Sequence, residues 1–411
     1  MKRYERYKDS GIKWLGEIPE HWESTRIVNL LSLKTERGFA NGELLSVYLD
    51  KGVIKNSDSD GKQVHKPSED LNAYQLVEIG DFVMNNQQCW RGSVGVSQYR
   101  GIISPAYHIF KLSDCLLRHY ANYLLRDYTM VTQYLIASKG VGSIQRILSF
   151  PWFKNSLCII PPKSEQKQIV HFLDERLALI DKYVKDKERE VELLKELKNA
   201  EINRAVTKSL NNSEWKSYKI KRLFNERSEK DHPNEPVLCA TQSSGVIPQS
   251  MYDNRVVVVN KGFENLKFVR VGDFVISLRS FQGGIEYAYY QGIISAAYTI
   301  LEPVDKNNSE YFKYLLKCHS FIQLLQTCVT GIREGQNINY EVLSRKIIQI
   351  PPLSEQQAIV AYIQQMEERI NKAITGIERE IELVKEYKTR LVSDVVTGKV
   401  DVRGVAVPEK K

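Results

Sequence analysis

A segment at residues 160–198 occurs twice in the chain, and this duplication constrains the fold more than any other feature. IPPKSEQKQIV at 160–170 returns as IPPLSEQQAIV at 350–360, which is 190 positions later. KEREVELLKELK at 187–198 returns at the same distance as IEREIELVKEYK at 377–388. Because the spacing does not change between the two matches, each copy is one continuous element.

Each copy is predicted to be a long helix that begins after a strand. The Pro-Pro pair keeps the residue before it extended and so closes off the preceding strand. Ser164 and Ser354 follow at positions where a hydroxyl can cap the amino end of a helix. Apolar side chains then recur at alternating spacings of three and four residues, with Glu, Lys and Arg between them. Such a helix is a rod of roughly 60 Å, too long for an ordinary surface helix, so it needs a partner.

The two helices are predicted to pair with each other as an antiparallel coiled coil. Each carries one charged residue on its apolar seam, and we set Lys187 opposite Glu367, because a lone polar seam position tends to fix the register. In this register the numbers of facing residues add to 554. The helix–helix seam then comprises Leu177, Ile180, Val184, Lys187, Glu367, Ile370, Ile374 and Ile377. The alternative is two unrelated long helices.

The duplication extends over whole halves of the chain. Three further matches keep nearly the same spacing: GDFV at 80–83 with 272–275, GIIS at 101–104 with 292–295, and HYANYLLRD with EYFKYLLKC, which aligns Tyr120 with Tyr311. Short apolar runs broken by glycines and polar clusters predict short strands between these motifs. With 411 residues the chain exceeds a single core. We therefore predict an α+β fold, in which two pseudo-two-fold related α/β domains are separated by the two long helices.

The predicted boundaries are 1–158 for the first α/β domain, 159–209 for the first long helix, 210–348 for the second domain, and 349–411 for the second long helix and the C-terminal tail. Residues 41–75 and 231–265 lie inside the repeated frame but show little mutual similarity. A shared frame with divergent inserts suits two related sites that read different targets. Neutral drift of loops gives the same pattern, so both interpretations stay open.

Composition narrows the class of protein less than the repeat does. The formal net charge of +8, from 58 basic and 50 acidic residues, fits a polyanionic partner without demanding one. The six cysteines form no C-x-x-C pair, so we expect reduced thiols and no zinc site. We find no signal peptide and no apolar run near the ~20 residues of a membrane span, and therefore expect the protein in the cytoplasm.

No constellation of residues predicts an active site. Gly398-Lys399 is followed by Val400 and lacks the upstream glycine of a phosphate-binding loop. The glycine-rich cofactor loop and the Asn/Asp-Pro-Pro-aromatic cluster of an adenine methyltransferase have no match in the sequence. The histidines form no H-E-x-x-H or comparable set. The interpretation is a chain with no catalytic residues and no metal site of its own.

Candidate binding chemistry follows the two GDFV strands. A polar loop comes after each strand, and a second pair of loops aligns KGVGSIQRILS at 139–149 with TGIREGQNINY at 330–340. Asn, Gln and Arg side chains grip base edges in the DNA major groove, and glycine permits close approach of the backbone to phosphate. The candidate DNA-binding residues are Asn85, Gln87, Gln88, Arg91, Gln145, Arg146, Arg279, Gln282, Gln336 and Asn337. The alternative for each is an ordinary amide-rich surface loop.

Taken together, these motifs resemble a known family. The residues that carry the likeness are YKDSGIKWLGEIPEHWE near the N-terminus, the two IPP-x-SEQ-x-x-IV helices with their ER-E-EL-KE-K ends, and VVTGKVDVRG at 395–404. This set is similar to the DNA-specificity subunit of a type I restriction-modification system. The likeness covers essentially the whole chain.

The resemblance implies a non-catalytic, sequence-specific subunit with two target-recognition domains, each of which reads one half of a split site in double-stranded DNA. It further implies that the long helices dock two adenine methyltransferase subunits, which bind S-adenosylmethionine and flip the target base. Restriction subunits that use ATP and Mg to translocate and cleave DNA would join the complex, and this chain would carry no cofactor. Two other classes stay open: a stand-alone DNA enzyme and a coiled-coil scaffold that binds no nucleic acid.

Overall fold

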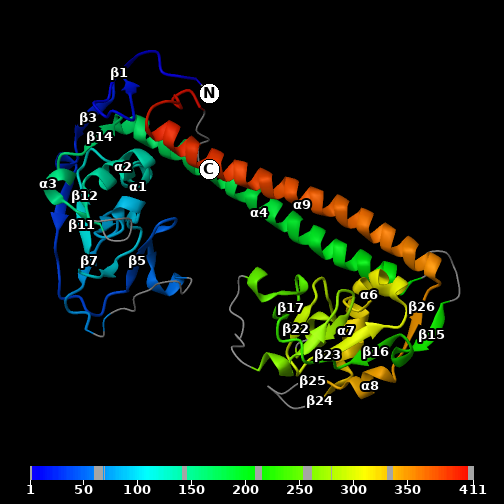
Figure 1. Ribbon diagram of the computed structural model, residues 1–411. Helices are drawn as coiled ribbons and strands as arrows, with labels where there is room; N and C mark the ends of the chain where they lie inside the picture. Colours follow the sequence, from blue (N-terminus) through cyan, green and yellow to red (C-terminus); the bar gives the residue numbers. More distant parts are fainter. Residues whose placement is uncertain are drawn as a thin grey trace. The chain divides into compact units, whose positions relative to one another are not determined.

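The structure is a computed structural model that describes residues 2–59, 68, 70–140, 146–208, 215–252, 262–278, 280–330 and 337–405. Its contacts divide the chain into two compact units: the first contains residues 1–186 and 380–411, and the second contains residues 187–379. Each unit holds one α/β domain together with part of both long helices (Figure 1). The chain therefore leaves the first unit along one long helix and returns to it along the other.

A four-stranded antiparallel sheet forms the centre of the first domain. Its strands lie in the order β4 (Leu31–Lys34), β11 (Tyr107–Leu112), β8 (Phe82–Asn85) and β9 (Val94–Val96). Phe110 and Phe82 face each other across β11 and β8, and both rings are buried. Around this sheet lie the pairs β1 (Tyr7–Asp9) with β2 (Glu17–Pro19), β3 (Glu23–Arg26) with β14 (Leu157–Ile160), β5 (Leu45–Tyr48) with β6 (Gly52–Lys55), β7 (Gln75–Val77) with β10 (Gly101–Ile103), and β12 (Ser138–Lys139) with β13 (Ile147–Leu148).

Helices complete the core of the first unit. They are α1 (Arg118–Arg126), α2 (Tyr128–Ile136), α3 (Phe150–Phe153), the first part of α4 (Lys163–Thr207) and the last part of α9 (Leu353–Val396), with the 3-10 turns η1 (Ile27–Asn29), η2 (Asn56–Asp58) and η3 (Cys89–Arg91). The apolar positions of α1 recur at helical spacing, and Tyr120 and Leu124 are buried. Leu391 and Val395 of α9 belong to the same hydrophobic core. The end of α9 is therefore part of the first unit.

The second domain repeats this arrangement. Its central sheet has the order β16 (Phe224–Arg227), β23 (Thr299–Pro303), β20 (Phe274–Ile276) and β21 (Glu286–Tyr287). The surrounding pairs are β15 (Lys216–Lys219) with β26 (Ile347–Ile350), β17 (Leu238–Thr241) with β18 (Gly245–Pro248), β19 (Lys267–Val269) with β22 (Gly292–Ile294), and β24 (Val329–Thr330) with β25 (Asn337–Ile338). The short helices and 3-10 turns are α5 (Ser280–Gly283), α6 (Ser309–Leu315), α7 (His319–Gln326), α8 (Tyr340–Ser344), η4 (Ile220–Arg222), η5 (Gln249–Met251), η6 (Phe263–Asn265) and η7 (Lys306–Asn308). The matching order of the central sheets confirms that the sequence repeat is a repeat of fold.

Both long helices begin one residue earlier than the predicted caps. Helix α4 spans 45 residues from Lys163 and α9 spans 44 residues from Leu353, so Ser164 and Ser354 lie inside the first turn rather than at its cap. Each following glutamate is buried and binds its own domain. Glu165 accepts a hydrogen bond from the Tyr4 hydroxyl and lies 2.7 Å from His21 Nε2, while Glu355 accepts one from the Trp215 indole at 3.2 Å. The repeated SEQ motif thus joins each helix to its domain.

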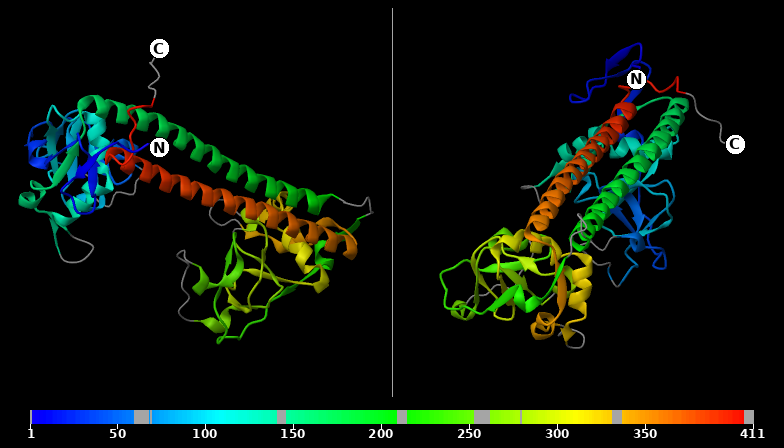
Figure 2. Two further views of the ribbon diagram at one scale, coloured as in Figure 1. Left: turned by 90° about the horizontal axis from the view of Figure 1, so that it is seen from above. Right: turned by 90° about the vertical axis from the view of Figure 1, so that its right-hand side faces the viewer.

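Within each unit, α4 and α9 lie side by side and run in opposite directions (Figures 1 and 2). In the first unit the Tyr183 hydroxyl bonds to Glu380, and Lys388 pairs with Asp181. In the second unit Lys198 Nζ donates to Asn371 Oδ1 at 3.1 Å, and the Tyr362 hydroxyl donates to Glu201 at 3.0 Å. These contacts confirm the antiparallel pairing. Of the eight seam residues, Val184, Ile374 and Ile377 are buried and the others are half-buried.

The predicted register, however, is wrong. The numbers of the four contacting pairs add to between 563 and 569 rather than 554. Lys187 does not meet Glu367: its Nζ donates to Glu190 at 2.9 Å, whereas Glu367 accepts a hydrogen bond from the Tyr314 hydroxyl at 3.1 Å. With Lys198 beside Asn371, Lys187 and Glu367 lie roughly 20 Å apart along the helices.

The domains explain this difference in register. Ala205 and Val206 of α4, together with Ile359 and Ile363 of α9, are buried in the core of the second domain. A seam of repeating apolar residues accepts several registers at similar cost, so contacts outside the seam decide among them. The ends of both helices are packed in domain cores. This packing contributes more to the free energy of folding than one ion pair between Lys187 and Glu367 on the seam would.

Candidate nucleic-acid interface

The polar loop after β8 is a structured turn in the first unit. Asn85 ends the strand, and its Oδ1 accepts hydrogen bonds from the backbone N–H groups of Gln87 at 3.0 Å and Gln88 at 3.2 Å. The turn continues into η3 and ends at Gly92, whose φ of 100° lies in the left-handed region that favours glycine. Asn85 therefore shapes the loop, whereas the side chain of Gln87 is exposed to solvent.

Trp90 is the centre of this loop. Its indole N–H donates to the carbonyl of Gln87 at 2.9 Å, which holds the ring in place. The guanidinium groups of Arg91 and Arg146 lie 5.2 Å and 5.5 Å from the centre of the ring. A cation within about 6 Å of an aromatic ring is attracted to its face. The ring thus positions two arginines that are far apart in the sequence.

The hairpin of β12 and β13 carries Arg146 to the loop. Leu148 N donates to the carbonyl of Asn86 at 3.3 Å, which joins the hairpin to the turn after β8. On the same hairpin, Lys139 Nζ lies 5.6 Å from the ring of Trp152, and that ring is 55% exposed. The structure therefore brings five of the candidate residues of the first half together: Asn85, Gln87, Gln88, Arg91 and Arg146. Gln145 lies outside the described residues.

A buried cysteine packs beneath the surface of the turn after β8. Cys89 is fully buried, and its thiol approaches the carbonyl of Asn86 at 3.9 Å. Burial raises the pKa of the Cys89 thiol to about 11, so the group is neutral near pH 7. The Oδ1 of Asn86 is also buried and has no hydrogen-bond partner within the described part of the chain. Neither residue was among the predicted site residues, and no local sequence pattern distinguishes them from other loop positions.

The second unit builds the corresponding turn with other side chains. After β20, the N–H of Ser277 donates to Ser280 Oγ at 2.8 Å, and α5 leads to Gly284 with a φ of 87°. Gln282 on α5 is exposed, and α5 lies against β25, which begins at the exposed Asn337. The same two chain segments therefore meet in both domains. Arg279 and Gln336 lie outside the described residues.

The two surfaces differ in chemistry although they share a frame. The first combines a tryptophan with two guanidinium groups. In the second, Gln282 occupies the position aligned with Trp90, because GDFV at 80–83 and at 272–275 are 192 positions apart. The strand β25, which lies against α5, begins at Asn337, a neutral amide. Guanidinium groups pair with phosphates and guanine edges, whereas amides pair with adenine edges.

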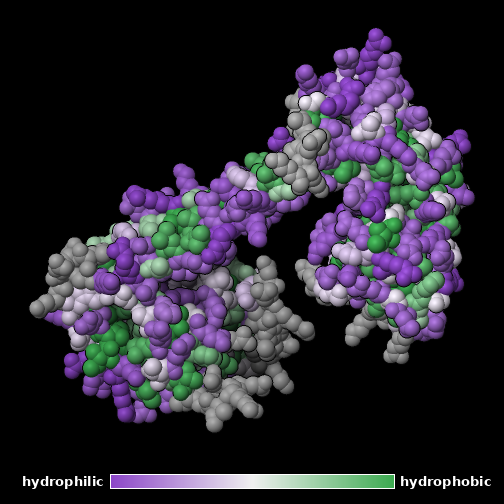
Figure 3. All heavy atoms as spheres, turned by 180° about the vertical axis from the view of Figure 1, so that it is seen from behind, coloured by the Kyte–Doolittle hydropathy of each residue, from purple (hydrophilic) through white to green (hydrophobic). Residues whose placement is uncertain are grey.

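The described residues contain neither a grouped metal-binding set nor a membrane-spanning helix. Within them, no set of three or more His, Cys, Asp and Glu side chains is grouped closely enough to hold a metal ion. No helix among them combines the length and apolar character that a membrane crossing requires. Apolar groups are interspersed with a mostly polar surface on the face shown in Figure 3.

Comparison with known proteins identifies the frame that both domains share. The family model for the type I restriction modification DNA specificity domain matches residues 19–193 and again residues 212–383. The chain thus contains two copies of that domain, and each match runs into one of the long helices.

Solved structures agree on the fold. A chain from a structural study of complex assembly and conformational transition of the type I R-M system matches with a TM-score of 0.65 and 15% identity, over 93% of this chain and 99% of the other. The HsdS subunit from Thermoanaerobacter tengcongensis matches with a TM-score of 0.52 and 16% identity, over 93% of this chain and 98% of that one. At this identity the likeness concerns the fold alone, and it spans nearly the whole of each chain.

Proposed function

Because the chain belongs to the family of type I restriction-modification DNA specificity domains, we propose that it selects the DNA sequence on which such a complex acts. Each unit reads one half of a bipartite target in double-stranded DNA. The observation that carries this proposal is the repeated pair of loop and hairpin, which has the same backbone frame but different side chains in the two units. Two different readers on one chain suit a target with two different halves.

The first unit offers positive charge to the DNA. Arg91 and Arg146 stand against the ring of Trp90, and guanidinium groups are the side chains that pair with phosphate and with guanine edges. The exposed amide of Gln87 adds a donor and an acceptor for a base edge. Binding by this unit is expected to depend strongly on salt, because guanidinium contacts to phosphate release counterions.

The second unit offers amides. Gln282 and Asn337 are exposed on elements that lie against each other, and amide groups can form paired hydrogen bonds with adenine. Arg279 and Gln336 remain candidates for this unit from the sequence alone. The proposal therefore assigns direct base reading to the second unit to a larger extent than to the first.

Catalysis is assigned to partners. In this proposal the chain is non-catalytic and docks two adenine methyltransferase subunits, which bind S-adenosylmethionine, together with restriction subunits that use ATP and Mg. The likeness in fold to a chain from a study of type I R-M complex assembly supports a role within a complex. The motif VVTGKVDVRG and the repeated SEQ helices are the features of this sequence that carry the family resemblance.

The direct test is to map methylated adenines in DNA from cells that produce this chain with its methyltransferase partner. The proposal expects one motif with two specified halves separated by unspecified bases. The purified chain alone should neither methylate nor cleave DNA. A chain that does either by itself is a stand-alone enzyme, and a chain that shows no salt-dependent DNA affinity even with its partners is a scaffold.

A further inference from the structure

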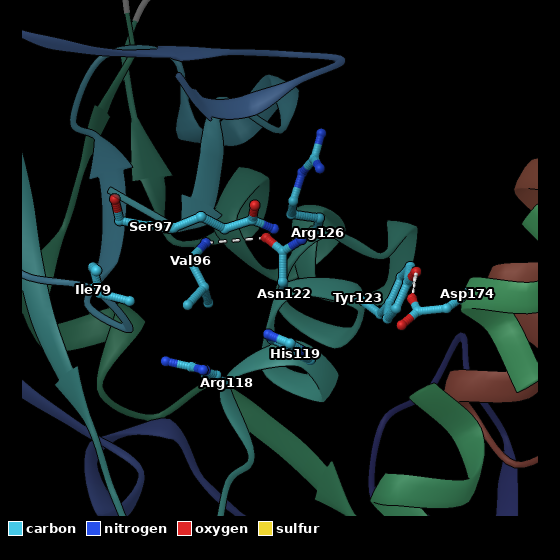
Figure 4. A pocket seen from close by; sticks show the side chains of 10 residues that line it. Ile79, Val96, Ser97, Arg118, His119, Asn122, Tyr123, Arg126 and Asp174 are labelled. Atoms are coloured by element: carbon cyan, nitrogen blue, oxygen red, sulfur yellow. Dashed lines mark hydrogen bonds between the residues drawn. The ribbon is translucent and has the colours of Figure 1, made fainter. Parts of the chain in front are cut away.

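The first domain has a cleft at the end of its central sheet, away from the polar loop after β8 (residues 85–92, here called the recognition loop). The cleft has a volume of about 500 Å³, and α1, the end of β9 and α4 line it (Figure 4). Tyr123 of α1 donates a 2.6 Å hydrogen bond to Asp174 of α4 across one side. Asn122 accepts one from the N–H of Val96 at 3.1 Å on the other side. Arg118 and His119, at the start of α1, are exposed on its rim.

Arg126, at the end of α1, lines this cleft beside the turn that follows β5. Arg126 Nη2 donates to the carbonyls of Asp50 at 2.7 Å and Leu49 at 3.2 Å, in the turn that follows β5. Burial lowers the pKa of this guanidinium, although an arginine stays charged in proteins. Arg126 therefore supports the wall of the cleft, and Arg118 is the arginine that a bound partner can reach.

The second domain has a cleft at the corresponding place. It has a volume of about 820 Å³, and the Tyr314 hydroxyl donates to Glu367 of α9 at 3.1 Å. Lys317 Nζ donates to the carbonyl of Gln242, after β17, and to buried Glu286, both at 2.7 Å. Tyr314 lies 191 positions after Tyr123, and Lys317 lies 191 positions after Arg126. Both clefts thus repeat a tyrosine–carboxylate bond and a cation that holds the turn of a hairpin.

The two carboxylates are not sequence counterparts. Gln364 stands 190 positions after Asp174, whereas Glu367 lies three residues further along α9, close to one helical turn. The tyrosine bond is nevertheless made in both domains. Each of these carboxylates is bound by a tyrosine within its cleft. At the rim of the first cleft Arg118 and His119 are exposed. At the rim of the second, His319 is exposed and Lys313 is half-buried and pairs with Glu310 at 3.1 Å.

The chemistry of the clefts favours an acidic protein segment over DNA. Val96 pairs with Phe82 at the start of β8, while the recognition loop begins at Asn85, roughly 10 Å away at the other end of the strand. Both clefts fall within the range of about 300–1,000 Å³ that is typical of ligand-binding pockets.

We propose that each cleft is a docking site for an acidic segment of a partner protein, and that the two clefts hold two copies of the same partner. This inference rests on the proposed function, in which two methyltransferase subunits bind the chain. Arg118 and Lys313 are the rim cations that receive the acidic side chains. Lys313 Nζ pairs with Glu310 at 3.1 Å and lies 4.7 Å from the ring of Tyr287 and 4.9 Å from that of Tyr289, which fixes its position.

The experiment measures how many copies of the purified methyltransferase subunit bind the full chain, by native mass spectrometry and by titration. Wild type should bind two copies. Arg118→Glu and Lys313→Glu should each weaken one of the two binding events by roughly tenfold or more, because like charges then meet at a docking surface. The double variant should weaken both. Arg118→Lys and Lys313→Arg keep the charge and should bind like wild type.

Matched controls separate docking from other defects. Lys13→Glu in the first unit and Lys221→Glu in the second reverse exposed charges that line neither cleft, and should leave both binding events unchanged. DNA affinity of the full chain should be the same in all variants. Two full-affinity copies on the double variant would overturn the docking sites. A selective loss of DNA affinity would show that the clefts bind DNA instead. If wild type binds no methyltransferase subunit, the proposed function fails first and this inference falls with it.

Discussion

The buried hydroxyl of Tyr311 donates a 3.0 Å hydrogen bond to the carbonyl of Val206, one residue before the end of α4. Its counterpart Tyr120 donates in the same way to the carbonyl of Val396, the last residue of α9, at 3.3 Å. The last carbonyls of a helix have no partner inside the helix. In each unit a buried tyrosine therefore satisfies one of them and holds the end of a long helix to the domain core.

Removing this hydroxyl should destabilise the second unit. Tyr311→Phe leaves the Val206 carbonyl buried without its partner, and an unsatisfied buried group costs about 1–3 kcal/mol. We expect urea denaturation to show a loss of that size, with faster hydrogen exchange at the end of α4. Tyr128→Phe is the control, because this side chain is 72% exposed. Equal stability of Tyr311→Phe and wild type would contradict the anchoring role.

The register of the two long helices can be tested by crosslinking within the second unit. Lys198 and Asn371 are hydrogen-bonded, so a Lys198→Cys and Asn371→Cys pair should react quickly with a short bifunctional thiol reagent. A Lys187→Cys and Glu367→Cys pair lies roughly 20 Å apart along the helices and should not be bridged. Both pairs are made in a background where the exposed Cys115 is replaced by serine. Efficient bridging of the second pair alone would restore the register that the seam charges suggest.

Trp90 should matter for DNA affinity through the arginines that it positions. Trp90→Ala removes the ring that holds Arg91 and Arg146, and each cation–π contact is worth about 0.5–2 kcal/mol. We expect target DNA to bind roughly 3- to 30-fold more weakly, as measured by fluorescence anisotropy at fixed salt. Trp90→Phe should keep part of the effect. Trp14→Ala, which changes a 43% exposed tryptophan outside the loop, should bind normally.

Two buried thiols give the first unit a dependence on alkaline pH. Burial raises the pKa of Cys89 to about 11 and of Cys158 to about 12, from an ordinary value of 9.0. Their contribution to stability is fully present below pH 9, where the unfolded thiols are still protonated. It is lost as the pH rises through the folded values, because the unfolded thiols release their protons first. The free energy of unfolding should therefore fall above about pH 9, and the fall should be shallower in Cys89→Ala than in wild type.

Much of the fold follows from the repeat. Two copies of one motif 190 positions apart predict two like domains, and the alternating apolar spacing predicts two long paired helices. The positions in the seam are buried or half-buried as their spacing requires. The register was missed because the seam alone does not determine it. Glu367, which looks like a seam charge in the sequence, is bound by Tyr314 of the domain instead.

The candidate site was predictable only in part. The loop after GDFV and the segment around Arg146 could each be picked out by their polar side chains and by their repetition. The two segments come together only in the tertiary structure, where the backbone N–H of Leu148 donates to the carbonyl of Asn86. The sequence likewise does not show that the Asn85 amide is used within the turn, or that Trp90 lies between two arginines. Trp90 and Arg146 are 56 positions apart, and pairs at this separation leave no periodic pattern in the chain.

In the proposed function each unit reads its own half of the target. The most direct measurement maps methylated adenines in cells that carry the chain and its methyltransferase partner, with loop variants made in one unit at a time. Gln87→Ala with Arg91→Ala should relax or change only one half of the methylated motif, and Gln282→Ala with Asn337→Ala should affect only the other half. A change in both halves from either pair, or a methylated motif that is the same in all variants, would show that the two units do not read separate halves.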